Sequence, residues 1–203
     1  ARALQRASEA GRLTEAKMKE VLDEIRTDAD MASAIVDRVR QYAKGQDLGR
    51  QTLELRELTA KSIREFNRQT GSELEIETRF SGRAMVDVNA LEIELCIINL
   101  LRNASEALAR QNIKQPKITV SIFEEVKRAE LRICDNGNFS EEKLSLLNEP
   151  TQSDKSSGLG LGLQIVRGIV ENHGGKLTFS RNKIGGLSVS ITLPLQIGRA
   201  SCR

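Results

Sequence analysis

Hydrophobic residues near the N-terminus recur at alternating spacings of four and three, which is the pattern of a heptad seam. Its members are Met18, Leu22, Ile25, Ala29, Ala32, Val36, Val39 and Ala43. Thr14 can cap the start of this helix and Gly45 can end it, while residues 1–10 predict the end of a preceding helix that breaks at Gly11. We expect residues 1–45 to form a helical segment that dimerises with a second copy of the chain. The alternative is that the seam packs on the chain's own second domain.

A polar stretch with two glycines, residues 46–51, predicts a linker, and a second domain is expected over residues 52–195. Short runs in it alternate between apolar and polar residues, which is typical of strands with one buried face. The expected strands are 52–54, 74–80, 118–122, 131–134, 177–179 and 187–193. Helical spacing predicts helices over 55–70, 91–110 and 163–172.

These elements predict an α+β fold, because helices alternate with strands that are joined by hairpins. We expect a two-layer sandwich in which one mixed sheet is covered on one face by helices, rather than a doubly wound parallel sheet. Residues 196–203 carry no pattern and are expected to be a tail.

Composition and charge narrow the range of partners. The chain has 31 Lys and Arg against 28 Asp and Glu, so its net charge of +3 gives no reason to expect nucleic acid or an acidic membrane surface. No apolar run reaches the ~18 residues of a membrane span, and Ala1 to Arg12 lack the apolar centre of a signal peptide. The three cysteines share no metal-ligand spacing, and two lie in apolar runs, which predicts a reducing compartment and core positions. They are Cys96, Cys134 and Cys202.

The stretch from Lys155 to Leu163 reads Lys-Ser-Ser-Gly-Leu-Gly-Leu-Gly-Leu and has a glycine at every second position from 158 to 162. Such a run favours neither helix nor strand, but it lets backbone N–H groups come close to a ligand. A predicted helix follows, and the N–H groups and dipole of a helix N-terminus favour phosphate. The stretch lacks the Gly-Lys-Ser/Thr of a Walker loop. A surface loop without a ligand is the alternative.

The helix predicted over 91–110 is broadly apolar but carries one narrow polar stripe. The stripe consists of Glu92, Cys96, Asn99, Asn103 and Glu106. Asn99 and Asn103 lie one turn apart. A carboxamide oxygen can ligate Mg²⁺ and its NH₂ group can donate to phosphate, so the pair suits a Mg²⁺–phosphate group. The alternative is that both amides bond to loops of the fold.

Asp135-Asn136-Gly137 follows directly on the strand predicted over 131–134. A carboxylate at the mouth of a pocket can accept from the exocyclic amine of adenine and would repel the keto oxygen of guanine. Asp135 would therefore favour ATP over GTP, and Gly137 would let the base lie against the backbone. The alternative is that Asp-Asn-Gly is an ordinary turn.

Together and in this order, the three motifs resemble those of the ATP-binding catalytic domain of two-component sensor histidine kinases. That domain belongs to the GHKL superfamily, which also holds gyrase, chaperone and mismatch-repair ATPases. Asn99 to Ala107 resembles the N box of the family, Asp135 to Gly137 its G1 box, and Gly158 to Leu163 its G2 box. The resemblance covers about residues 52–195 and implies the Bergerat-type ATP-binding fold. Leu22 to Gly45 resembles the second helix of the dimerisation and histidine-phosphotransfer hairpin.

The resemblance also implies a role for each motif. Asn103 would ligate Mg²⁺, Asn99 would join the same metal and phosphate network, and Asp135 and Gly137 would hold the adenine of ATP or ADP. A lid would cover the phosphates, formed by Lys155, Ser157, Gly158, Leu159, Gly160, Leu161, Gly162 and Leu163.

Three departures from the family pattern qualify these roles. Asn138 and Phe139 stand where the G1 box has its second glycine, and the Phe-rich box before the lid is reduced to Glu149-Pro150. The phosphoacceptor histidine is missing, because the one histidine, His173, lies at a helix C-terminus, where a role as cation or cap explains it. We therefore expect that the chain cannot phosphorylate itself.

The resulting prediction is an ATP-dependent protein-histidine kinase fragment that transfers the γ-phosphate to a histidine missing from this chain, for relay to a response-regulator aspartate. The expected partners are a second copy, the phosphoacceptor helix and a receiver domain, and the expected location is the cytoplasm, as part of an inner-membrane-anchored receptor. One alternative is a non-catalytic nucleotide-binding and dimerisation module, which the altered boxes favour. Another is a GHKL-type ATPase, although such enzymes carry a glutamate base at the place of Asn99.

Overall fold

The computed structural model describes residues 18, 49–71, 74–148 and 161–196. The chain divides into two units, Ala1–Asp47 and Leu48–Arg203, and the second unit contains the sheet and its helices. Apart from Met18, the predicted heptad helix lies outside the described residues, so its pairing with a second copy stays a prediction.

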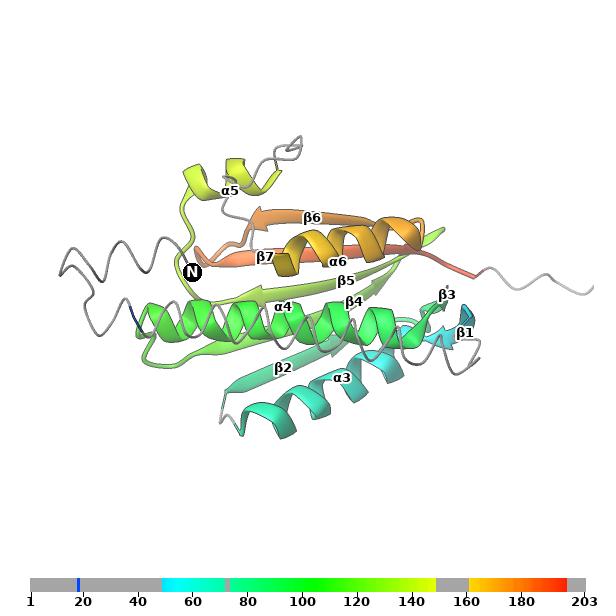
Figure 1. The fold of residues 1–203 in the computed structure, drawn as a ribbon, viewed down its shortest axis with the longest axis horizontal. Helices are drawn as coiled ribbons and strands as arrows, with labels where there is room; N and C mark the ends of the chain where they lie inside the picture. The colour runs from blue at the N-terminus through cyan, green and yellow to red at the C-terminus, as the bar shows by residue number, and fades with distance from the viewer. Residues whose placement is uncertain (1–17, 19–48, 72–73, 149–160, 197–203) are drawn as a thin grey trace, which may run out of the picture. The chain divides into compact units, whose positions relative to one another are not determined.

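A five-stranded sheet forms one layer of the domain (Figure 1). Its strands, in spatial order, are β2 (Glu75–Phe80), β4 (Lys117–Glu124), β5 (Arg128–Asp135), β7 (Leu187–Pro194) and β6 (Lys176–Arg181). β2 and β4 pair in parallel, whereas the other three pairs are antiparallel. Short turns are sufficient for the antiparallel β4–β5 and β6–β7 hairpins, while the parallel pair needs a long crossover. The predicted mixed sheet is confirmed.

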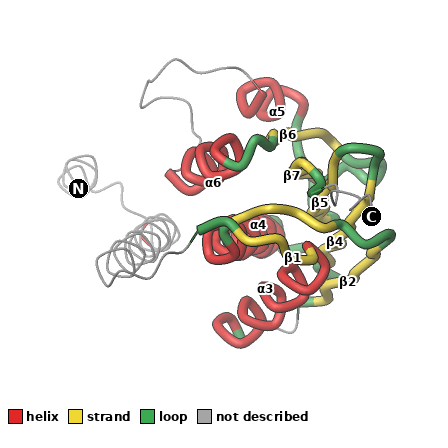
Figure 2. The backbone as a smooth tube through the Cα atoms, turned by 90° about the vertical axis from the view of Figure 1, so that its right-hand side faces the viewer, coloured by secondary structure: helices red, strands yellow, loops and turns green. Residues whose placement is uncertain are grey.

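Three helices cover one face of this sheet (Figure 2). They are α3 (Leu55–Thr70), α4 (Ala90–Arg110) and α6 (Leu161–Asn172). Asn89 caps α4, since its side-chain oxygen accepts from the N–H groups of Leu91 and Glu92. The core between helices and sheet is aliphatic, and Ile93, Ile97 and Leu101 of α4 are 0% exposed. Each such side chain stabilises the fold by about 1.5–3 kcal/mol, so α4 is a firm support for its polar stripe.

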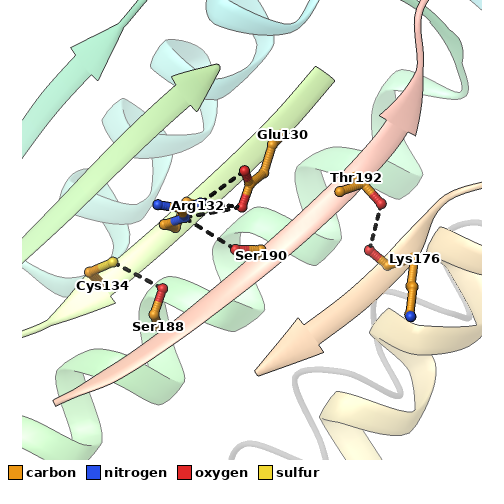
Figure 3. Close-up of polar contacts among 7 residues, drawn as sticks. All are labelled: Glu130, Arg132, Cys134, Lys176, Ser188, Ser190 and Thr192. Atoms are coloured by element: carbon orange, nitrogen blue, oxygen red, sulfur yellow. Dashed lines mark hydrogen bonds and ion pairs between the residues drawn. The ribbon is translucent and has the colours of Figure 1, made fainter. Parts of the chain in front are cut away.

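The opposite face of the sheet is polar (Figure 3). Strand pairing sets side chains of β5 beside hydroxyl groups of β7: Glu130 with Thr192, Arg132 with Ser190, and Cys134 with Ser188. The guanidinium of Arg132 donates to both carboxylate oxygens of Glu130 and lies 5.0 Å from the ring centroid of Phe123. The predicted two-layer architecture, with helices on one face only, is thereby confirmed for the described residues.

The two cysteines among the described residues do not share one environment, and Cys202 lies outside those residues. Cys96 is fully buried in α4, as predicted for a core residue. Cys134 is on the polar face, where its Sγ lies 3.2 Å from the hydroxyl of Ser188. The prediction of a core position for Cys134 was wrong because side chains of a strand alternate between its faces, and the buried neighbour Ile133 takes the inward position.

Two short elements were not predicted. β3 (Met85–Val88) pairs antiparallel with β1 (Gln51–Glu54) in a separate ribbon, and α5 (Glu141–Asn148) precedes the glycine-rich stretch in the sequence. Four residues are too few to display a reliable alternation, and α5 has little apolar periodicity.

Two finer predictions need correction at the edges of the domain. The alternation within the strand predicted over 74–80 puts Thr78 on one face with Ile76 and Phe80, but Thr78 is exposed because β2 is an edge strand with a neighbour on one side only. The expected tail begins later than residue 196, since the N–H of Gln196 donates to the carbonyl of Met85 at 2.8 Å.

Candidate nucleotide-binding site

Asp135 is a carboxylate in a position that strand periodicity assigns to the core. Leu131 and Ile133 precede it on the inward face of β5, and Asp135 itself is 8% exposed. Its Oδ1 accepts from the N–H groups of Gly137 at 2.9 Å and Leu187 at 3.2 Å. Burial raises the pKa of the Asp135 carboxyl above its usual range, and these N–H donors oppose that rise. The carboxylate is therefore held in one orientation at an energetic cost.

Two glycines leave the space that Asp135 occupies. A Cβ on Gly186 would lie 2.2 Å from the carbonyl oxygen of Asp135 and 2.6 Å from its Oδ1, so no other residue fits there without displacing the aspartate. A Cβ on Gly137 would meet Oδ1 at 3.0 Å and Oε1 of Gln111 at 3.1 Å. In the sequence, Gly186 lies between the strands expected over 177–179 and 187–193, and no local signal connects it with Asp135.

The loop after Asp135 is bonded to the segment that runs from the end of α4 to the start of β4. The Asn136 side chain accepts from the N–H of Lys117 and donates to the carbonyl of Gln115, both at 2.8 Å. The N–H of Asn138 donates to Oε1 of Gln111 at 2.6 Å, directly after α4. Asn136 is thus a structural residue, and Gln111 is a site neighbour that sequence reasoning missed.

The amide pair on α4 is formed as predicted. Asn99 is 6% exposed, Asn103 is half-buried, and Nδ2 of Asn103 donates to Oδ1 of Asn99 at 3.1 Å. Glu92 and Cys96 of the same stripe are also buried. The stripe therefore presents polar groups within an otherwise apolar environment, where amide groups need partners.

Gly162, the second residue of α6, lies against this pair. A Cβ on Gly162 would lie 3.0 Å from both Oδ1 and Nδ2 of Asn99. The third glycine of the glycine-rich stretch is thus packed on the first asparagine of the polar stripe, which joins two of the three predicted motifs. Leu161 and Leu163 belong to the same first turn of α6, and Leu163 is half-buried. The remaining predicted lid residues lie outside the described residues: Lys155, Ser157, Gly158, Leu159 and Gly160.

His173 is buried between the end of α6 and the start of α4, at 5% exposure. Its Nε2 accepts from the N–H of Asn89 at 3.0 Å, and Nδ1 lies 2.8 Å from the carbonyl oxygen of Ile169. Because Nε2 accepts from a backbone N–H, Nδ1 is the ring nitrogen that can donate to this carbonyl. Of the two roles expected for His173, cation or cap, the contact of Nδ1 with the Ile169 carbonyl in the last turn of α6 fits the cap, and the ring also connects α6 to the start of α4.

Two further features, a metal cluster and a membrane-crossing helix, are absent from the part of the chain that the structure describes. No three His, Cys, Asp or Glu side chains of the described residues gather as a metal cluster. Among those same residues, no helix combines the length and the apolar character that crossing a bilayer requires.

Comparison with known proteins fits this geometry. A sequence profile of the histidine kinase-, DNA gyrase B- and HSP90-like ATPases matches residues 88–197. The solved histidine kinase domain of the E. coli osmosensor EnvZ is 31% identical and superimposes with a TM-score of 0.59 over 78% of this chain and 97% of that domain. The catalytic domain of histidine kinase ThkA, at 23% identity and a TM-score of 0.60, shares the fold over 72% of this chain and 97% of its own. The chain therefore belongs to the histidine kinase-, DNA gyrase B- and HSP90-like ATPase family, in its sensor histidine kinase branch.

Curated relatives are longer sensor proteins. The C4-dicarboxylate transport sensor protein DctS of Rhodobacter capsulatus is 29% identical over 186 residues, which are 88% of this chain and 28% of DctS. The sensor protein FixL of Bradyrhizobium diazoefficiens is 27% identical over 190 residues, which are 88% of this chain and 36% of FixL. The chain thus spans roughly a third of the length of these two relatives.

Proposed function

We propose that this chain is the ATP-binding catalytic portion of a two-component sensor histidine kinase. It would transfer the γ-phosphate of ATP to a histidine on another segment, for relay to an aspartate of a response regulator. The observation that carries the proposal is the packing of Gly162 on Asn99, where an added Cβ would lie 3.0 Å from both Oδ1 and Nδ2 of the amide. This contact joins the glycine-rich segment to the amide pair, as expected if both serve the same phosphates.

Asp135 is proposed to recognise adenine. The N–H groups of Gly137 and Leu187 both donate to Oδ1 of its carboxylate. Oδ2 is proposed to accept from the exocyclic amine of the base, and it would repel the keto oxygen of guanine. This arrangement supports a preference for ATP or ADP over guanine nucleotides.

Asn103 and Asn99 are proposed to hold Mg²⁺ and phosphate. Hard carboxamide oxygens suit this ion, and Mg²⁺ usually keeps waters and phosphate oxygens beside one or two protein ligands. Nδ2 of Asn103 is engaged by Asn99, so its Oδ1 is the atom proposed to face the metal. When bound, Mg²⁺ would offset the charge of the phosphates.

The contribution of the protein to transfer would be positioning and charge compensation. Lys155 and the backbone amides from Ser157 to Leu163 are proposed to cover the phosphates. The acceptor must come from elsewhere, because His173 is buried and both of its ring nitrogens are engaged. In-line geometry therefore requires a separate histidine-bearing helix.

The assembly is proposed from the relatives and from the heptad pattern. Residues 1–45 would pair with a second copy, and a receiver domain would take the phosphate. The parent protein would be a receptor anchored in the inner membrane, with this portion in the cytoplasm. These proposals concern a longer protein, of the length of the sensor relatives.

One observation favours a second candidate, a nucleotide-holding module without catalysis. At the place of the second G1 glycine, the N–H of Asn138 is bonded to Gln111 and that of Phe139 to the carbonyl of Gly185. A loop fixed in this way can hold a base without supporting turnover.

The deciding experiment supplies the missing acceptor. The chain is incubated with radiolabelled ATP and Mg²⁺, with and without a separate helical hairpin that carries its histidine. We expect acid-labile label on the hairpin and none on the chain itself. The Asp135→Asn variant should not label the hairpin. Nucleotide binding without label would favour the non-catalytic module. Rapid release of inorganic phosphate instead would identify an ATPase.

A further inference from the structure

The turn between β6 and β7 lies at the end of β5 that carries Asp135, because Cys134 pairs with Ser188 and β6 with β7. Within this turn one side chain, Asn182, makes contacts in two directions. Its Nδ2 donates to the main-chain carbonyl of Asp135 at 2.7 Å, across 47 residues of sequence. Its Oδ1 accepts from the N–H of Gly186 at 2.9 Å and from that of Ile184 at 3.2 Å.

The polarity of these partners fixes the orientation of the amide. Two carbonyl oxygens, those of Asp135 and Leu187, lie on the Nδ2 side, at 2.7 and 3.4 Å. Two N–H groups lie on the Oδ1 side. A carboxylate of the same shape would set oxygen against oxygen on the first side, so an aspartate can replace only the turn-closing half of this role.

The same turn supplies a donor to the carboxylate itself. Leu187 donates to Oδ1 of Asp135 five residues after Asn182, and Gly186 packs on the aspartate so closely that a Cβ would lie 2.2 Å from its carbonyl oxygen. Asn182 therefore holds both the main chain of Asp135 and the segment that orients its side chain.

We infer that Asn182 is a positioning residue for base recognition: it anchors the backbone of Asp135 to the β6–β7 turn, so that Oδ1 stays on Leu187 and Oδ2 faces the adenine. This inference rests on the proposed function, in which Asp135 binds the base. It predicts that Asn182 acts on the choice between adenine and guanine without touching either.

The test compares three proteins by calorimetry with ADP and with GDP in the presence of Mg²⁺. In Asn182→Asp, loss of the anchoring donor should weaken ADP binding about tenfold and reduce the preference for ADP over GDP by a similar factor. Lys183→Ala, in the exposed part of the same turn, is the matched control and should behave as the unaltered protein. Thermal unfolding establishes that each variant is folded at the temperature of the titration.

A second readout needs no nucleotide. In Asn182→Asp the amide proton of Leu187 should exchange with solvent faster than in the Lys183→Ala control, because the turn is no longer tied to Asp135. A protein that prefers ADP, with an Asn182→Asp variant of unchanged preference, would overturn this inference and leave the proposed function standing. Equal affinity of the unaltered protein for ADP and GDP would overturn the proposed function instead.

Discussion

Gly162 at the start of α6 lies against the side chain of Asn99 on α4, where an added Cβ would come within 3.0 Å of both atoms that end the amide. The contact joins the first turn of α6 to the amide pair on α4. A change of one methyl group at this point should thus affect the site more than the fold.

Gly162→Ala is predicted to displace Asn99 and weaken binding of Mg²⁺–ATP about tenfold, the cost of one hydrogen bond to a charged group. Gly168 of the same helix is the matched control, since a Cβ there meets nothing within 4 Å. Gly168→Ala should leave binding unchanged and stabilise the domain by about 0.5–1 kcal/mol. Calorimetry and thermal unfolding measure both effects. Equal ATP affinity in the two variants would show that the contact is irrelevant to the site.

Asp135→Asn is predicted to lower affinity for ADP at least about tenfold, because a charge-assisted hydrogen bond to the base is lost. The amide keeps an oxygen that can accept from Gly137 and Leu187, so the loop should keep its conformation. Titration calorimetry with ADP and GDP measures the change. An unchanged ADP affinity would remove Asp135 from the site.

The stability of the nucleotide-free domain should respond to Asp135 in a pH-dependent way. Burial raises the pKa of this carboxyl in the folded state above its unfolded value. Protonated Asp135 therefore stabilises the fold below the unfolded pKa, of about 3.9, and this contribution disappears as pH rises through the higher folded pKa. The gain in melting temperature of Asp135→Asn over the unaltered protein should thus be larger at pH 7 than at pH 4. Asp87→Asn, at an exposed position on β3, is the control, and a gain that is constant with pH would contradict the assignment.

Nucleotide is predicted to protect backbone amides from Gly158 to Leu163 against hydrogen exchange, because these N–H groups would bond to phosphate oxygens. Exchange is measured by mass spectrometry with Mg²⁺ present, with and without ATP. The amides of Glu124, the last residue of β4, and of Arg128, the first residue of β5, serve as an internal reference. If ATP binds and the lid exchanges at the same rate, the lid does not hold the phosphates.

His173→Gln is predicted to reduce the free energy of unfolding by about 1–3 kcal/mol, since buried partners at Asn89 and Ile169 lose a well-placed ring. It should have no effect on histidine-linked label, because the unaltered chain alone should carry none. Chemical denaturation and acid-lability of the label test the two statements. Label on the chain alone that disappears in His173→Gln would make His173 an acceptor and refute its assignment as a structural ring.

Local patterns in the sequence determined much of this protein. The alternation of Leu131 and Ile133 fixed the inward face of β5, because side chains of a strand repeat every second residue, although the strand predicted over 131–134 stopped one residue before Asp135. The helical period likewise placed Asn99 and Asn103 one turn apart. In the structure, Nδ2 of Asn103 lies 3.1 Å from Oδ1 of Asn99. Short elements such as β3 could not be predicted from the sequence, since four residues carry too little periodicity.

Tertiary structure alone decided which distant residues meet. Nothing local in the sequence connects Gly162 with Asn99, Gly186 with Asp135, or Asn182 with the carbonyl of Asp135. These contacts depend on how the β6–β7 turn and α6 close on the rest of the domain, and on packing so tight that one Cβ would collide. Periodicity reports the face on which a residue lies, whereas the partner on that face is set by the path of the whole chain.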